Sequence, residues 1–128
     1  MESSFSLSQI EQIAQPVRDL ERAVAFYRDT LGVKFLFTSN GLAFFDCGGV
    51  RLMLSRPESP EFDHPGSVLY FKVADIHQTY AALLARGVTF IDTPHLIANM
   101  GDYDLYMSFF PDGEGNTLAL SGSIPHKN

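Results

Sequence analysis

The chain has 128 residues, 45% of them hydrophobic and 19% charged, which suits a single globular domain with a buried core. Its formal net charge of −6 argues against nucleic acid or an anionic membrane surface as a partner, because both attract basic faces. The opening residues Met1-Glu2-Ser3-Ser4 lack the basic start of a signal peptide, and no apolar run is long enough to span a membrane. The single cysteine, Cys47, excludes an internal disulfide, so we expect a cytoplasmic protein.

A helical pattern occurs twice along the chain. In each copy an aspartate stands where it can accept hydrogen bonds from the first turn of a helix, Asp19 in the first and Asp75 in the second. Apolar residues then recur at helical spacing, and a glycine suited to a left-handed backbone closes each segment. The sequence therefore predicts helices over Asp19–Leu31 and Asp75–Arg86.

The remaining apolar runs predict strands. Turn residues separate them, and we expect these strands, in chain order, over residues 10–17, 33–38, 42–47, 50–55, 67–73, 88–91, 105–110 and 116–120. Three prolines mark residues 57–66 as a connector. Residues 92–104 contain no regular period and are interpreted as an inserted loop, and the polar tail from Gly122 is expected to fray.

The order of these elements is itself repeated. Residues 9–56 and 67–121 each contain a strand, a helix and three further strands, so the chain is interpreted as two tandem βαβββ modules in one domain, followed by the tail 122–128. The predicted fold class is α+β. Each module leaves one face of its sheet without a helix, and pairing two curved mixed sheets covers these faces and encloses a cleft, with the helices outside.

Strand alternation predicts which side chains face that cleft. Val50, Leu52 and Leu54 form the better helix-packing set, so their neighbours on the same strand face the cleft. Equivalent phases in the other strands complete the expected cleft, which contains Gln12, Arg51, Met53, Val68, Tyr70 and Ala119. Tyr106 and Ser108 are further candidates, although the alternation of residues 105–110 permits either phase.

The segments D-L-E-R-A-V-A-F-Y-R-D-T-L-G, which ends at Gly32, and P-D-G-E-G-N-T-L-A-L, which ends at Leu120, resemble the vicinal oxygen chelate superfamily. This group contains glyoxalases, bleomycin-resistance proteins and extradiol dioxygenases. The resemblance spans roughly residues 9 to 121 and implies the paired-module fold. It does not imply one activity, because the superfamily includes lyases, isomerases, dioxygenases, thiol transferases and non-catalytic drug-binding proteins.

Metal-dependent members of that superfamily take ligands from four equivalent strand positions. The resemblance places these positions at Gln12, Met53, Val68 and Ala119. Only Gln12 has an oxygen donor, and one amide oxygen does not hold a divalent ion against water. We therefore expect no metal and no other cofactor, and Gln12 is interpreted as a hydrogen-bonding residue of the cleft wall.

Arg51 is the most informative polar candidate. In the cleft it would need an anionic partner, either a ligand or Asp46 across the Gly48-Gly49 turn. The alternative is that the strand has the opposite phase, or that the side chain extends to the solvent at the cleft mouth.

The other polar candidates each have a simpler structural reading. His95, in the inserted loop, has a pKa range suited to acid–base chemistry, although a lone loop histidine is more often solvated. Tyr70, Tyr106 and Ser108 have hydroxyls that can orient a ligand, but strand aromatics are usually core residues. Cys47 is interpreted as an inert thiol, and no catalytic residue is assigned.

Two classes of function follow from these observations. The first is a metal-independent small-molecule binding protein of the glyoxalase/bleomycin-resistance type with an aromatic or anionic ligand. The second is a lyase or isomerase of the same superfamily with a non-standard metal site or none. Because related proteins commonly dimerise, and because Phe5 and Leu7 precede the first predicted strand with nothing evident to cover them, we also expect a homodimer.

Overall fold

A computed structural model describes residues 5–126, so the opening residues Met1–Ser4 lie outside the described part. It has two βαβββ modules, which confirms the predicted fold class. The strands and helices, in chain order, are β1 (Gln12–Pro16), α1 (Leu20–Ala25), η1 (Phe26–Thr30), β2 (Lys34–Ser39), β3 (Leu42–Cys47), β4 (Val50–Ser55), η2 (Pro60–Phe62), β5 (Leu69–Val73), α2 (Ile76–Ala85), β6 (His95–Asn99), β7 (Tyr103–Pro111) and β8 (Thr117–Pro125).

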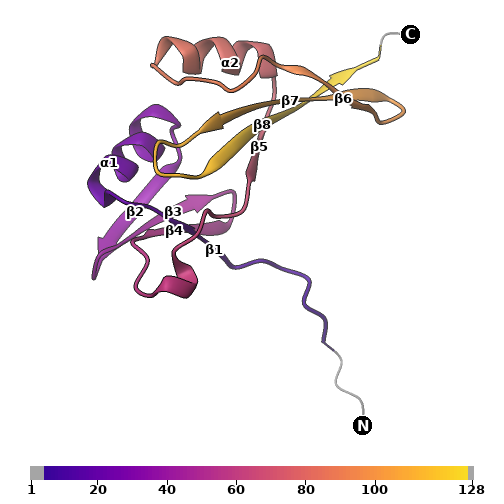
Figure 1. Ribbon diagram of the computed structural model, residues 1–128. Coiled ribbons are helices and arrows are strands. Elements are labelled where there is room, and N and C mark those ends of the chain that lie inside the picture. The colour runs from indigo at the N-terminus through magenta and orange to yellow at the C-terminus, as the bar shows by residue number, and fades with distance from the viewer. Residues whose placement is uncertain (1–4, 127–128) are drawn as a thin grey trace.

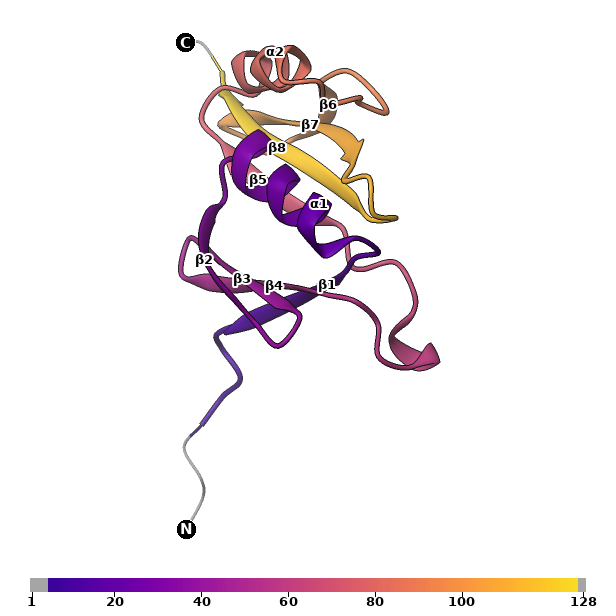
Figure 2. The same ribbon diagram turned by 90° about the vertical axis from the view of Figure 1, so that its left-hand side faces the viewer.

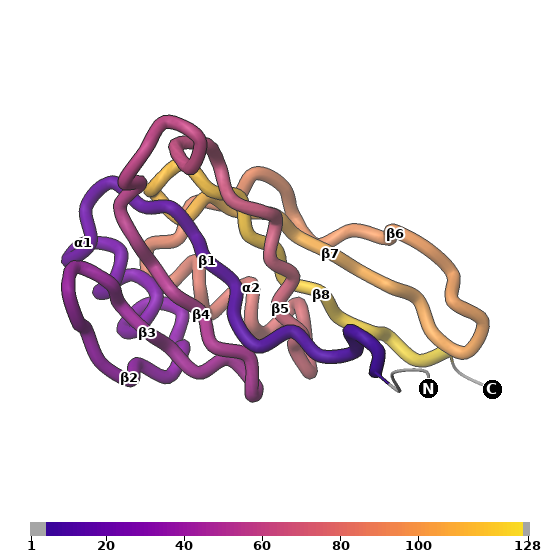
Figure 3. The backbone as a smooth tube through the Cα atoms, turned by 90° about the horizontal axis from the view of Figure 1, so that it is seen from below, coloured from indigo at the N-terminus to yellow at the C-terminus, as the bar shows by residue number. Residues whose placement is uncertain are grey.

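Each module forms one four-stranded sheet of the same topology. The strand order is β1-β4-β3-β2 in the first sheet and β5-β8-β7-β6 in the second. The first strand of each module pairs in parallel with its last strand, and the other pairs are antiparallel. α1 lies over the first sheet and α2 over the second, both on the upper side in Figure 1. Figure 2 shows α1 at a level between the two sheets. Neither α1 nor α2 covers the side seen from below, where β1 lies beside β5 (Figure 3).

The two helices begin as predicted. The Asp19 carboxylate accepts a hydrogen bond from the Arg22 backbone N–H at 3.1 Å, and Asp75 does the same for Gln78 at 3.1 Å. The first helix does not stay α-helical to Leu31, because its second half, η1, is a π-helix. Gly32 then ends it with a φ of 77°, a conformation that favours glycine.

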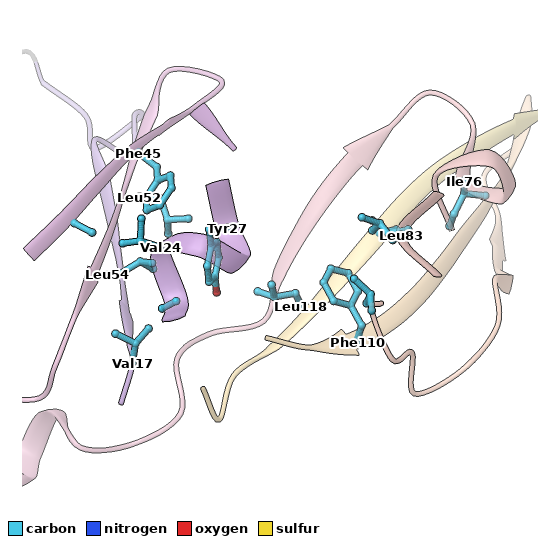
Figure 4. Close-up of a cluster of buried hydrophobic side chains, with 14 residues drawn as sticks. Val17, Val24, Tyr27, Phe45, Leu52, Leu54, Ile76, Leu83, Phe110 and Leu118 are labelled. Atoms are coloured by element: carbon cyan, nitrogen blue, oxygen red, sulfur yellow. The ribbon is translucent and has the colours of Figure 1, made fainter. Parts of the chain in front are cut away.

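The core confirms which residues face the helices. In the first module the buried cluster includes Val17, Val24, Tyr27, Phe45, Leu52 and Leu54, and in the second Ile76, Leu83, Phe110 and Leu118 (Figure 4). Leu52 and Leu54 are 2% and 0% exposed, whereas Arg51, the residue before Leu52 on the same strand, is exposed. The helix-facing phase of β4 is therefore the one that its sequence predicts.

Three segments of the second module are assigned wrongly by the sequence: residues 88–91, residues 92–104 and the tail from Gly122. Residues 88–91 form no strand, since a single backbone hydrogen bond, from Ile91 to Phe109, joins them to β7. Within this segment the Phe90 ring packs on Tyr80 and Phe110 at centroid distances of 4.5 and 5.1 Å. The supposed loop 92–104 contains β6, which starts directly after Pro94 and pairs with β7.

The described part of the tail from Gly122 is not frayed, because β8 continues to Pro125 in register with β7, and residues 127–128 lie outside the described part. Gly122 lies against Ile76 of α2, where a Cβ atom would come within 2.9 Å of the Ile76 Cβ. The polar composition of this segment does not predict a strand, because the strand depends on backbone pairing with β7 and on close contact with α2.

The turn between β7 and β8 joins the two modules through a buried polar cluster. The Asp112 carboxylate is 3% exposed and accepts hydrogen bonds from the Tyr27 hydroxyl at 2.7 Å and from Asn116 Nδ2 at 2.8 Å. Asn116 also donates to the carbonyl of Pro16 at 2.7 Å and accepts from the N–H of Gly66 at 2.8 Å. These contacts fix the second module against β1, η1 and the connector.

Glu114, in the same turn, completes this junction. Its Oε1 accepts the backbone N–H groups of Arg18 and Asp19 at 2.7 and 2.9 Å, just before α1, and its Oε2 accepts from Arg22 Nε at 2.6 Å. Burial alone would raise the pKa of this carboxyl, but the hydrogen bonds from Arg22, Asp19 and Arg18 outweigh it and lower the pKa. The second module thus supplies an anion to the start of the first module's helix, where the backbone N–H groups and the helix dipole favour one.

Candidate functional site

The helix-free face of the first sheet brings together three of the predicted cleft residues. Gln12 on β1 stands opposite Arg51 on β4, and Met53 follows one step along the same face. Arg51 Nε donates a hydrogen bond to Gln12 Oε1 at 2.6 Å, and Gln12 Nε2 lies 3.8 Å from the Met53 sulfur. Strand alternation therefore places these side chains on the face for which they were predicted.

The Arg51 guanidinium lies on this face without a strong ionic partner. It sits over the Phe44 ring at 5.8 Å from the centroid, and its one ion-pair contact in residues 5–126 is Glu11 at 3.9 Å, whose side chain is 88% exposed. The suggested Asp46 pair does not form, since the Asp46 carboxylate instead accepts the Gly49 N–H at 3.0 Å. Apart from the bond to Gln12, the described residues make no hydrogen bond to this guanidinium.

A pocket of about 430 Å³ adjoins this group along the same face. Its floor comes from β1, β3 and β4, including Ala14, Leu42 and Met53, and its wall comes from the connector, including Phe62 and His64. Pockets of this size accommodate small organic ligands. The sequence indicated only a break in regular structure at the connector, and its three prolines do not show that it folds back over the sheet.

Residues predicted for the cleft from the second module lie elsewhere. Val68 and Tyr70 line a separate pocket of about 360 Å³ beside Ile13 and Cys47. Ala119 is fully buried, with Tyr70 opposite it on one neighbouring strand and Phe109 opposite it on the other. The second sheet therefore contributes nothing to the pocket on the first.

Tyr106 and Ser108 do not face the cleft side. Both lie on the face of β7 opposite to Phe109. The centroid of the Tyr106 ring lies 5.9 Å from that of His77 on α2. The Ser108 hydroxyl is buried and donates to the backbone carbonyl of Asp92 at 2.8 Å. The prediction for these two residues is wrong, because residues 105–110 carry large side chains on both faces and only the pairing with β8 determines the phase.

His95 begins β6, so it is not a loop residue. It stands opposite Met107 on β7 and shares that residue's face, which is the helix-free face of the second sheet. Its Nδ1 lies 2.8 Å from the Thr93 carbonyl oxygen and 3.8 Å from Asp92 Oδ2. The contact with a carbonyl makes Nδ1 the protonated nitrogen and leaves Nε2 as an acceptor in the neutral ring.

The residues at the superfamily's metal positions do not fit a divalent ion. Met53, Val68 and Ala119 offer no oxygen or imidazole donor, and the Gln12 oxygen already accepts a hydrogen bond from a guanidinium, whose charge repels a cation. Across residues 5–126 no cluster of three His, Cys, Asp or Glu side chains is placed to hold a metal.

Cys47 is half-buried beside the turn to β4. Burial, and to a lesser extent the neighbouring Asp46 carboxylate, raises the pKa of its thiol, which disfavours the reactive thiolate.

Two aromatic residues on the first sheet were missed. Phe37 on β2 stands opposite Phe44 on β3, and their ring centroids are 4.9 Å apart. Phe37 is 52% exposed, so this pair extends the helix-free face toward the sheet edge. The alternation of β3 places Phe44 beside Arg51 and Met53, which was a usable signal; the bulge in β2 near Phe37 was not visible in the sequence.

Comparisons with known proteins assign the chain to a family that has this fold. The family model of the glyoxalase/bleomycin resistance protein/dioxygenase superfamily matches residues 9–120. A glyoxylase-like domain-containing protein of Didymella fabae is 32% identical over 126 residues, covering 88% of this chain and 91% of that protein. The chain belongs to the glyoxalase/bleomycin resistance protein/dioxygenase superfamily.

Solved structures share the fold at lower identity. A superfamily member from Sphaerobacter thermophilus superposes with a TM-score of 0.75 at 24% identity, covering 91% of this chain and 98% of that one. A lactoylglutathione lyase from Agrobacterium tumefaciens superposes with a TM-score of 0.72 at 24% identity, covering 91% and 95%. No helix within residues 5–126 has the length and apolar character needed to cross a membrane.

Proposed function

We propose that this protein is a metal-independent small-molecule binding protein, whose aromatic or anionic ligand occupies the pocket on the first sheet. The observation that carries this proposal is the hydrogen bond from Arg51 to Gln12, because it engages the one oxygen donor among the four equivalent positions with a cationic group. The adjoining pocket of about 430 Å³ supplies the volume for an organic ligand.

Metal analysis of the purified protein tests metal independence. Elemental analysis should find no stoichiometric zinc, nickel, manganese or iron, and dialysis against a chelator should leave the thermal midpoint unchanged. A fall of several degrees that a divalent ion reverses would refute the proposal, because a metal that binds only the folded chain stabilises it.

A lyase or isomerase is the second candidate, favoured by the orientation of His95. Its Nδ1 contact with Thr93 leaves Nε2 as a proton acceptor on the helix-free face of the second sheet. An enzyme of this kind would lose its turnover in a His95→Gln variant that still binds ligand. Binding unaccompanied by turnover in the wild-type protein favours the first candidate.

We further propose that the protein acts in the cytoplasm as a homodimer. Phe5, Leu7 and Ile10 precede or adjoin β1 and are 77%, 97% and 66% exposed, an apolar segment that a second copy would cover. Light scattering at tens of micromolar should give twice the chain mass. A monomer at that concentration would contradict the dimer without affecting the ligand proposal.

A further inference from the structure

We infer that the ligand of the first sheet is an aromatic carboxylate, with its ring on Met53 against Phe44 and its carboxylate on Arg51. This inference rests on the proposed function, since it names the chemical class that the same face would bind. It depends on three adjacent features of the face: an oriented guanidinium, an aromatic wall and an apolar pocket.

The guanidinium is held in a fixed orientation. Its Nε is hydrogen-bonded to Gln12 at 2.6 Å and its Cζ lies 5.8 Å from the centroid of the Phe44 ring, so two contacts on different strands restrain it. The Nη groups make no hydrogen bond within residues 5–126, and their nearest carboxylate, Glu11, is 3.9 Å away on an exposed side chain. A planar fork with free donors is suited to a carboxylate.

The aromatic wall stands beside the place where the body of the ligand would lie. Phe44 is directly opposite Met53, and Phe37 extends the wall on the next strand with its ring 4.9 Å from that of Phe44. An aromatic ring placed on Met53 contacts both a thioether and a ring edge or face, two contacts that favour aromatic over saturated groups.

The spacing joins these features into one site. Arg51 and Met53 are two residues apart on β4, about 6.6 Å along the strand. Met53 also lines the pocket of about 430 Å³, so a fused ring system can extend from Met53 into the pocket while its carboxylate reaches Arg51. Asp46 stands opposite Arg51 but is engaged by the Gly49 N–H, so it does not compete directly for the guanidinium.

Three related compounds test the inference on the full chain. The compounds are 2-naphthoate, its neutral amide 2-naphthamide, and the saturated decalin-2-carboxylate. Because the chain has no tryptophan, naphthalene fluorescence reports binding without a tryptophan background, and calorimetry measures the saturated compound. The naphthoate should bind at least tenfold more tightly than the amide, and about three- to tenfold more tightly than the saturated acid.

Four variants assign the contacts. Arg51→Met should weaken naphthoate roughly ten- to hundredfold and leave the amide unchanged. Gln12→Glu places a carboxylate of nearly the same shape beside the guanidinium and should also weaken naphthoate at least tenfold. Phe44→Leu should weaken naphthoate about three- to tenfold but not the saturated acid. Arg28→Gln removes an exposed charge paired with Asp29 on η1, away from this face, and should change nothing.

The outcomes separate this inference from the proposed function. Equal binding of amide and naphthoate, or naphthoate binding that survives Arg51→Met, would overturn the aromatic carboxylate class while leaving metal-independent binding intact. A failure of all three compounds to bind also overturns it. Stoichiometric metal in the purified protein would instead overturn the proposed function, whichever compounds bind.

Discussion

The carboxylate of Glu114 links the two modules, and replacing it should destabilise the whole fold. Its side chain is 1% exposed, and it accepts two backbone N–H groups and the Arg22 guanidinium. In Glu114→Gln the amide oxygen still serves the backbone, but the charge is lost and an NH₂ group faces the guanidinium. A hydrogen bond to a charged group is worth about 1.5–3 kcal/mol.

The expected cost lies within that range. Arg22 is 61% exposed and can be rehydrated, so the variant does not leave a buried unpaired cation. We therefore expect the free energy of unfolding to fall by about 2 kcal/mol. For a chain of this size that corresponds to roughly 8 °C in the thermal midpoint.

Denaturant unfolding followed by circular dichroism measures this loss. Glu21→Gln, on the exposed surface of α1, is the matched control and should lie within about 0.5 kcal/mol of wild type. A double-mutant cycle with Arg22→Met should give a coupling energy of about 1–2 kcal/mol between the two side chains. A Glu114→Gln variant as stable as its control would refute the view that this carboxylate joins the modules.

The remaining predictions concern the same junction and β8. Because the folded-state pKa of Glu114 is depressed, its contribution is complete above the unfolded value of about 4.3 and is lost as pH falls through the folded pKa. The stability difference between wild type and Glu114→Gln should therefore shrink from pH 5 to pH 3 in thermal melts. Tyr27→Phe removes a donor from buried Asp112 and should cost about 1–3 kcal/mol. Tyr80→Phe on the other helix should cost little by the same assay. Gly122→Ala should lower the midpoint through overpacking against Ile76, at about 1–3 kcal/mol.

The sequence alone determined the two-module fold and which residues of β4 face away from the helix. Helical periodicity with a capping aspartate is a local signal, so both helices could be located before any tertiary contact was known. Alternation in β4 was equally clear, because apolar residues occupy only every second position, and it placed Arg51 and Met53 on the helix-free face.

Tertiary structure decided the features that depend on contacts between distant segments. The phase of residues 105–110 became visible only through pairing with β8, since large side chains occupy both faces. Residues 88–91 have the composition of a strand but form none, and Phe90 among them packs on Tyr80 of α2. The polar residues after Leu120 form a strand because β7 pairs with them. The turn that ends at Gly115 was recognised only as a turn. Its role in holding Tyr27 and the start of α1 arises from hydrogen bonds between residues more than 80 positions apart, for which local patterning gives no signal.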